Sequence, residues 1–395
     1  MSAPLQKKPF PREHAMNSTR RSLLFLTAVF VLVTAVARAA DEPLDSKKVR
    51  QLRQKVQSGE KLTPEEQGYY DRARDARKKG ELKYNASMAP AASAAAESGA
   101  AAKPLTDMAG TDCYKGEDGG LYGGGRNSPP ELHLQAALAE AGKIRPLDTE
   151  GKPADDGKIV LLSMGMSNTT LEFQEFVKTA MTDAQRSPRL MVLDGSRAGQ
   201  TAADWTRAVR NGPRSGPAWS TVLERLKAAN LSPLQVQVVW AKMAEKEPAG
   251  LGEFPAHARK LQEDTKEALV LLKQYCPNVR IAYVSSRTYG GYTHGALNPE
   301  PYAYESAFAM RWLIQDQLRG EPSMNYRDGK FPLLLWGPYL WANGATPRAD
   351  GFAWRRDDYK NGGIHVTDSG AQKVAGQLLK FFKSDPTAKT WFAEH

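Results

Sequence analysis

A serine at the end of an apolar run is the first residue of this sequence that could carry out chemistry. The stretch LLSMGMSNTTLEF, residues 161–173, leaves an apolar segment through Gly165 and presents Ser167 followed by a polar cluster. A serine hydroxyl becomes a strong nucleophile when a neighbouring base takes its proton. His365, in GIHVTDSG before the last helical pattern, is a candidate base. Together they would attack an ester, whereas Ser167 without a base would be an ordinary helix-capping serine.

Strands that alternate with helices must position these two residues. Five apolar segments predict strands, at 158–164, 189–194, 234–241, 279–286 and 331–337. Helical patterns cover 201–210, 217–229, 255–275 and 302–320, one more follows Ser167, and another follows His365. This alternation predicts an α/β fold, with a parallel sheet covered by helices on both faces. In such a sheet the functional site lies beyond the carboxyl ends of the strands.

The loops that follow the predicted strands supply further candidate residues at the same edge. An oxyanion formed by attack on an ester needs hydrogen-bond donors. Gly199 in DGSRAGQT offers a backbone N–H, and Lys242 in KMAE offers an ammonium group. Candidate substrate contacts are Asn168, Arg287 and Tyr289. Residues of these types also occur in ordinary helix caps, at strand ends and on solvated surfaces. The prediction of a site therefore depends on their common location at one edge of the sheet.

Three short motifs at these positions resemble the sequence blocks of the SGNH or GDSL hydrolases, which are secreted esterases and deacetylases. Gly165-Met166-Ser167 is similar to the Gly-Asp-Ser block, AGQT at 198–201 resembles Ser-Gly-x-Thr, and HVTDSG at 365–370 resembles the last block. GMSNTT, VSSRTYGGY and LLWGPYLWANG are most similar to a secreted bacterial branch. The resemblance covers about residues 157–383. It implies a flavodoxin-like three-layer α/β/α sandwich, nucleophile Ser167, base His365, and no cofactor.

The sequence departs from the family pattern at three places. Met166 stands where the family has Asp, and WAKMAE at 240–245 replaces the Gly-x-Asn-Asp block, so that Lys242 is the nearest substitute for the oxyanion-binding Asn. Gly362 stands three residues before the histidine, where the family has the Asp that orients the imidazole. Asp357 and Asp358 are the possible acid partners in its place.

Two functional hypotheses from different classes follow. The first is an exported serine esterase or deacetylase that uses Ser167 and His365, and the resemblance implies O-acetylated carbohydrate as a substrate class. The second is a catalytically impaired protein of the same fold that binds glycan without turnover, which the altered blocks favour. A nucleotide or flavin binder is disfavoured, because the Gly-rich segment at 119–127 lacks the Gly-Lys-Ser/Thr of a phosphate loop.

The N-terminal residues predict export and a separate appendage. Arg20-Arg21, the apolar run SLLFLTAVFVLVTAVA and the small-residue site ARAA predict a signal peptide, cleaved after Ala39, whose removal leaves no membrane span. The predicted organisation is a signal peptide at 1–39, a charged helical segment at 40–85, an Ala-rich disordered linker at 86–104 and the hydrolase-like domain at 105–395. The charged segment reads as a helical hairpin. Thr63, Pro64 and Glu66 there form a helix-start pattern.

The charge distribution argues against a nucleic-acid partner. Residues 1–39 carry +5 and residues 40–85 carry +3 of the net charge of +10, which leaves +2 for the main domain. No zinc-binding spacing such as C-x-x-C or H-E-x-x-H occurs. Export makes a disulfide between Cys113 and Cys276 chemically feasible, and the sequence leaves both this pairing and the oligomeric state open.

Overall fold

The computed structural model describes residues 102–207 and 216–393, together with residues 61–78 and seven residues between 44 and 55. The predicted signal peptide at 1–39 lies outside the described residues, as does most of the predicted linker at 86–104. The chain divides into two compact units, Met1–Pro90 and Ala91–His395.

The first unit contains helix α3 (Pro64–Lys78), whose start follows the predicted pattern. Thr63 Oγ1 accepts a hydrogen bond from the Glu66 N–H at 3.2 Å, and Glu66 Oε2 accepts one from the Thr63 N–H at 3.0 Å. These reciprocal bonds satisfy two N–H groups that a helix start leaves open. Tyr69 and Ala73 are the buried side chains of this helix. The predicted start of this helix at Thr63 and Pro64 is therefore confirmed.

The second unit is built on a five-stranded parallel sheet with the strand order β4-β3-β5-β6-β7. The strands are β3 (Ile159–Gly165), β4 (Leu190–Leu193), β5 (Val236–Lys242), β6 (Ile281–Val284) and β7 (Leu333–Trp336). Numbered along the sheet, this is the 2-1-3-4-5 order of flavodoxin-like folds. A short antiparallel pair, β1 (Cys113–Tyr114) and β2 (Glu117–Asp118), precedes the sheet. All five predicted strands are confirmed.

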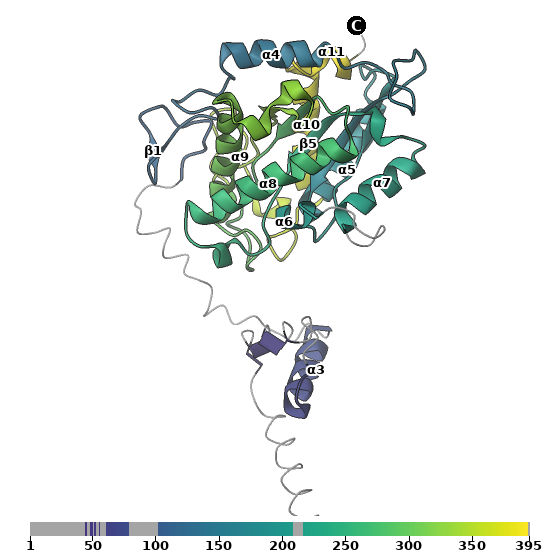
Figure 1. Cartoon of the computed structure of the whole chain (residues 1–395). Helices are drawn as coiled ribbons and strands as arrows, with labels where there is room; N and C mark the ends of the chain where they lie inside the picture. The colour runs from purple at the N-terminus through teal and green to yellow at the C-terminus, as the bar shows by residue number, and fades with distance from the viewer. Residues whose placement is uncertain are drawn as a thin grey trace, which may run out of the picture. The chain divides into compact units, whose positions relative to one another are not determined.

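Helices cover both faces of the sheet (Figure 1). One layer contains α4 (Glu131–Ala141), α5 (Ser167–Thr182), α10 (Asp368–Ser384) and α11 (Lys389–Phe392). The other contains α6 (Ala202–Trp205), α7 (Pro217–Ala228), α8 (Ala256–Tyr275) and α9 (Tyr302–Leu318). Short 3₁₀ turns are η2 (Pro233–Gln235), η3 (Pro248–Leu251), η4 (Pro322–Met324), η5 (Tyr326–Asp328) and η6 (Arg356–Asp358). The α/β/α sandwich is thus confirmed.

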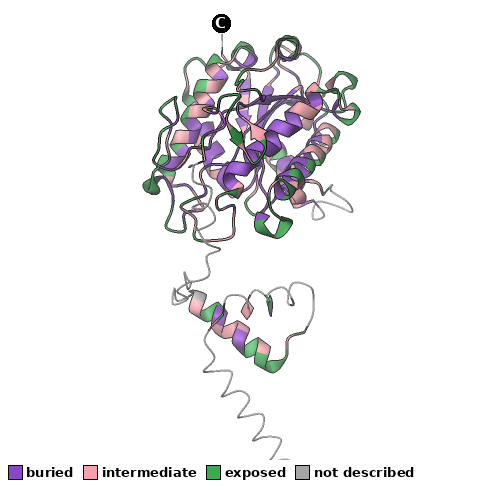
Figure 2. Ribbon diagram, turned by 90° about the vertical axis from the view of Figure 1, so that its left-hand side faces the viewer, coloured by how far each residue is buried: buried purple, intermediate pink, exposed green. Residues whose placement is uncertain are grey.

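The core forms because successive strand residues point to opposite faces. Val160 and Leu162 pack in the cluster that contains α7, α8 and α9, whereas Ile159 and Leu161 pack in the cluster that contains α5 and α10. Figure 2 shows buried residues along the sheet and on the inner sides of the helices. A strand buried on both faces reads as a continuous apolar run, which is why the sequence revealed the strands.

Several details differ from the expectations or complete them. The helix expected at 201–210 is the four-residue α6, and residues 208–215 lie outside the described part of the chain. Cys113 is exposed, Cys276 is buried, and both are free thiols. Burial raises the pKa of Cys276 to about 12. Within the described ranges, no helix is long and apolar enough to cross a membrane.

Candidate active site

Ser167 is the first residue of α5, and a tight turn at the end of β3 places it there. Gly165 has a φ of +155°, and a Cβ at this position would collide with the Lys242 carbonyl oxygen and with Thr169 Oγ1. Only glycine therefore lets β3 pass this close to the end of β5 before α5 starts. The turn leaves Ser167 half-buried at the carboxyl edge of the sheet.

The hydroxyl of Ser167 meets the imidazole of His365, although 198 residues separate them in the chain. Ser167 Oγ lies 2.9 Å from His365 Nε2, which is hydrogen-bond distance. His365 is half-buried and lies in the segment between η6 and α10. The structure therefore brings together the two residues whose chemistry the sequence paired.

Asn168 holds the backbone on both sides of His365. Its Nδ2 donates to the Ile364 carbonyl at 2.8 Å, and its Oδ1 accepts from the Val366 N–H at 3.3 Å. Asn168 is only 2% exposed, so these bonds form away from water. The structure thus uses both ends of this amide to position the histidine, whereas the sequence suggested a substrate contact.

The loop that follows β6 packs against the segment before His365. The His294 N–H donates to the Gly362 carbonyl at 3.3 Å, and a Cβ at Gly363 would collide with the Tyr292 carbonyl oxygen. Tyr289 is half-buried, with its ring centroid 5.0 Å from that of Tyr292 and 6.2 Å from that of Trp341. Tyr289 therefore belongs to an aromatic cluster beside the histidine segment.

The two possible acid partners are not hydrogen-bonded to His365. Asp358 is buried, and its carboxylate accepts from the Arg355 N–H at 2.7 Å and from Lys373 Nζ at 2.5 Å. Asp357 is exposed, and its backbone carbonyl accepts a hydrogen bond from Thr367 Oγ1 at 2.8 Å. Among the residues that the structure describes, no carboxylate is hydrogen-bonded to the imidazole. Within this described part of the chain, the histidine therefore has no carboxylate partner of the kind that completes a triad.

The environment of His365 favours the neutral imidazole. Burial lowers its pKa below the ordinary value, and the positive charges of Lys360 and Arg287 lower the pKa further. A neutral imidazole accepts a proton, so His365 is in the state that a general base requires at neutral pH.

Lys242 is fully buried and bound to a carboxylate that the sequence analysis did not single out. Its ammonium group donates to both carboxylate oxygens of Glu172, which is also fully buried. Burial lowers the pKa of Lys242 to about 8, and Glu172 opposes this effect. The Lys242 ammonium is therefore paired with a buried carboxylate. The sequence analysis had suggested instead that Lys242 donates to the oxyanion.

Gly199 lies in an ordered loop at the same edge of the sheet. Its φ is +78°, and its exposed position has open space around the Cα. Two hydrogen bonds hold this loop against the turn between β3 and α5. The Arg197 N–H donates to the Gly165 carbonyl at 3.1 Å. Thr170 Oγ1 lies 2.8 Å from Ser196 Oγ. The backbone N–H of Gly199 has no hydrogen bond to another described residue.

Glu172 and the positioning role of Asn168 were missed at the level of sequence. Both lie on one face of α5, four residues apart, and point toward the histidine segment and β5. The sequence does contain a signal for the buried charge, because Glu172 stands between Leu171 and Phe173 among the apolar residues of the helix. The described residues contain no group of three or more metal-ligating side chains that could hold a metal ion.

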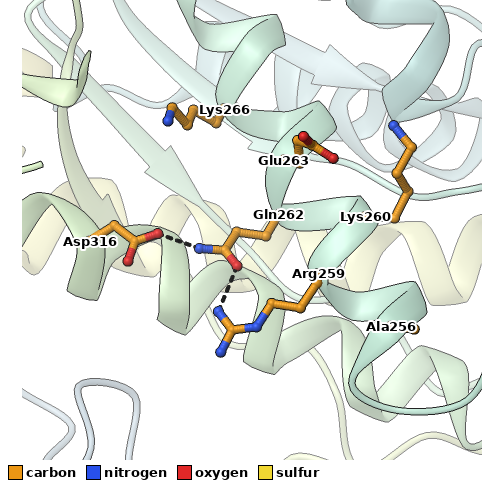
Figure 3. A pocket seen from close by; sticks show the side chains of 7 residues that line it. All are labelled: Ala256, Arg259, Lys260, Gln262, Glu263, Lys266 and Asp316. Atoms are coloured by element: carbon orange, nitrogen blue, oxygen red, sulfur yellow. Dashed lines mark hydrogen bonds between the residues drawn. The ribbon is translucent and has the colours of Figure 1, made fainter.

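A surface hollow of about 470 Å³ lies on the opposite helix layer, beside α8 and α9 (Figure 3). Gln262 accepts from Arg259 Nη1 at 2.9 Å and donates to Asp316 at 2.5 Å across it. The Arg259 guanidinium stacks over the Trp312 ring at 3.7 Å from its centroid. None of the candidate site residues lines this hollow.

Among known proteins, this chain has distant similarity to solved structures alone. No family model matches the chain, and no curated protein matches it. A solved structure that is similar in part is that of a proposed acylhydrolase from Bacteroides fragilis NCTC 9343. It is 12% identical, with a TM-score of 0.31, over 64% of this chain and 96% of that chain. A similarity of this degree identifies neither the family nor the reaction of this chain.

Proposed function

We propose that this protein is a serine hydrolase that cleaves ester bonds by acyl transfer. The observation that carries the proposal is the 2.9 Å distance between Ser167 Oγ and His365 Nε2 at the carboxyl edge of a parallel sheet. A hydroxyl at this distance from a neutral imidazole is arranged to lose its proton as it attacks.

The reaction proceeds in two balanced steps. Ser167 Oγ attacks the acyl carbon while His365 Nε2 takes the hydroxyl proton, and His365 then gives that proton to the departing alcohol. Water attacks the resulting acyl-serine through the same histidine, which releases the acid and restores the Ser167 hydroxyl. The oxyanion of each tetrahedral intermediate accepts from the Ser167 N–H, which belongs to the open first turn of α5, and from the Gly199 N–H.

The missing carboxylate predicts a slower reaction than that of a full triad. A carboxylate bonded to the second ring nitrogen fixes the tautomer and stabilises the imidazolium. Here Asn168 fixes the backbone around His365 and supplies no charge. This feature also favours the second candidate function, a glycan-binding protein of the same fold that no longer turns over its ligand.

Export and the substrate class belong to the same proposal. The predicted signal peptide at 1–39 supports export to the periplasm or the medium, and the resemblance to SGNH hydrolases supports an O-acetylated carbohydrate as substrate. The half-buried rings of Tyr289 and Tyr292, beside the histidine segment, are the aromatic groups against which a sugar ring could pack.

The test is hydrolysis of 4-nitrophenyl acetate by the purified protein without its signal peptide. Wild-type protein should release nitrophenol, and Ser167→Ala should reduce release to the uncatalysed rate without changing Tm. Ser384→Ala is the matched control, because Ser384 is exposed near the far end of α10. Equal rates for Ser167→Ala and wild type would contradict the proposal.

A further inference from the structure

Arg287 follows β6, and its backbone is fixed at the same edge of the sheet as Ser167. The Ser285 N–H donates to the Ala241 carbonyl at 3.0 Å, and the Arg287 N–H donates to Ser306 Oγ at 3.2 Å. The whole residue is only 7% exposed. An arginine is rarely buried to this extent without partners for its charge.

The guanidinium group of Arg287 is not hydrogen-bonded to any of the residues that the structure describes. Its Nε and Nη1 are buried without partners. A guanidinium carries five N–H donors and stays charged in proteins, so burial without acceptors is unfavourable. A bound ligand or an ordered water molecule must then supply the acceptors.

The buried charges around Arg287 do not balance. Lys242 and Arg287 are two cations that interact with the single carboxylate of Glu172. Both oxygens of that carboxylate accept from the Lys242 ammonium. One buried positive charge is therefore left in excess, and one negative charge at Arg287 would neutralise it.

The excess charge lies within electrostatic reach of the candidate catalytic pair. The charge of Arg287 contributes to the lowered pKa of His365, after burial and Lys360. The Arg287 charge also interacts with Glu172, with Tyr359, which is buried, and with Lys242. Ser167 follows β3 and Arg287 follows β6 at the same edge of the sheet, with β5 between these two strands, so a molecule bound at Ser167 would extend toward Arg287.

We propose that Arg287 binds a carboxylate of the substrate, so that the ester cleaved at Ser167 belongs to a molecule that also bears a carboxylic acid. The carboxylate carries one negative charge, which matches the one excess positive charge, whereas a phosphate monoester carries nearly two. Planar guanidinium and carboxylate groups also form strong charge-assisted hydrogen bonds. This inference rests on the proposed function, because it assigns the specificity of the same site.

The test compares two acetate esters that differ in one charge, 4-acetoxybenzoate and 4-acetoxybenzamide. Wild type should favour the benzoate in kcat/KM by about tenfold to a hundredfold, the range of one charged hydrogen bond. Arg287→Gln should bring the benzoate-to-benzamide ratio close to one, and Arg287→Lys should retain part of it. The ratio cancels any effect of Arg287 on His365 that both esters share. Arg259→Gln removes an equivalent charge in the hollow of Figure 3, which none of the candidate site residues lines, and should preserve the ratio.

A binding measurement keeps the two proposals separate. The Ser167→Ala variant should bind 4-hydroxybenzoate more tightly than 4-hydroxybenzamide in calorimetry, and adding Arg287→Gln should abolish that difference. Turnover of both esters at equal kcat/KM would overturn the carboxylate site and leave the serine hydrolase intact. No turnover, with Arg287-dependent binding of the benzoate, would overturn the hydrolase and leave the anion site. An equal loss of kcat on both esters in Arg287→Gln would assign Arg287 to the oxyanion and overturn this inference.

Discussion

Replacing Asn168 by Ala separates the positioning of His365 from the stability of the fold. The variant loses the donor to the Ile364 carbonyl and the acceptor for the Val366 N–H, the two bonds that hold the backbone around the imidazole. Ser167 and His365 themselves stay unchanged. We expect this variant to lose both stability and activity, and to lose more activity than the loss of stability alone would explain.

The size of both effects follows from the two bonds. A buried polar group left without a partner lowers the free energy of unfolding by about 1–3 kcal/mol. The Val366 N–H makes the longer bond, 3.3 Å, and is taken at about 1 kcal/mol, so the two groups together cost about 2–4 kcal/mol. With an unfolding entropy of about 2.1 cal/mol/K per residue over roughly 290 residues, Tm should fall by about 3–7 °C. A displacement of His365 by about 1 Å should lower kcat by about a hundredfold.

Differential scanning calorimetry and the nitrophenyl acetate assay measure the two effects. Asn278→Ala is the matched control, because Asn278 Nδ2 also donates to a backbone carbonyl, that of Leu234, at 2.7 Å. Asn278 precedes β6, at the amino edge of the sheet. The control should lose stability and keep its kcat. An Asn168→Ala variant with reduced Tm and wild-type kcat would refute the positioning role.

Three further predictions concern the charges around the site. Gly362 is exposed, and a Cβ there would meet nothing within 4 Å. Gly362→Asp should therefore fold normally and raise kcat, by at most the roughly 10⁴-fold that a triad carboxylate contributes; an unchanged kcat would show that this position does not reach the imidazole. The kcat/KM should rise with pH as His365 loses its proton, because only the neutral imidazole can act as a base. Since the pKa of His365 is lowered, kcat/KM should already be constant at neutral pH. Lys360→Gln removes a charge that lowers this pKa, so the acid limb of kcat/KM should move to higher pH, and a shift to lower pH would contradict the electrostatic account. Glu172→Gln leaves two buried cations without a carboxylate and should cost about 3–5 kcal/mol in urea unfolding, whereas Glu175→Gln, in a surface pair with Lys178, should have little effect. Similar stabilities for these two variants would refute the buried-charge account.

The fold was predictable from the sequence because its signals are local. Apolar runs such as 158–164 identify strands buried on both faces, and Thr63 with Glu66 identifies the start of α3. Helix α4 has no comparable signal, because its apolar residues do not form a clear stripe on one face. It owes its place to burial of His133, Ala137 and Ala141 in the folded molecule.

The site was predictable only in part, because contacts between distant segments leave no local trace. Ser167 and His365 could be predicted because each lies next to a predicted strand or helix, and the loops at the carboxyl ends of parallel strands share one edge of the sheet. The partner of Lys242 was not found, since the Glu172 carboxylate meets it across 70 residues of chain. Lys242 lies within β5, where the alternation of side chains directs it inward with Trp240 to the α5 layer. Strand β5 ends one residue later than predicted, so Lys242 belongs to the strand and is buried, whereas the sequence analysis placed it in the loop that follows.

Covalent labelling of the serine by a fluorophosphonate tests most directly whether His365 activates Ser167. The reagent forms a bond from an activated serine oxygen to phosphorus and releases fluoride, so mass spectrometry locates the modified residue. We expect one adduct per chain on Ser167, formed at equal rates in wild type and Ser384→Ala and at a much lower rate in His365→Ala. No adduct on Ser167, or the same labelling rate with and without His365, would contradict it.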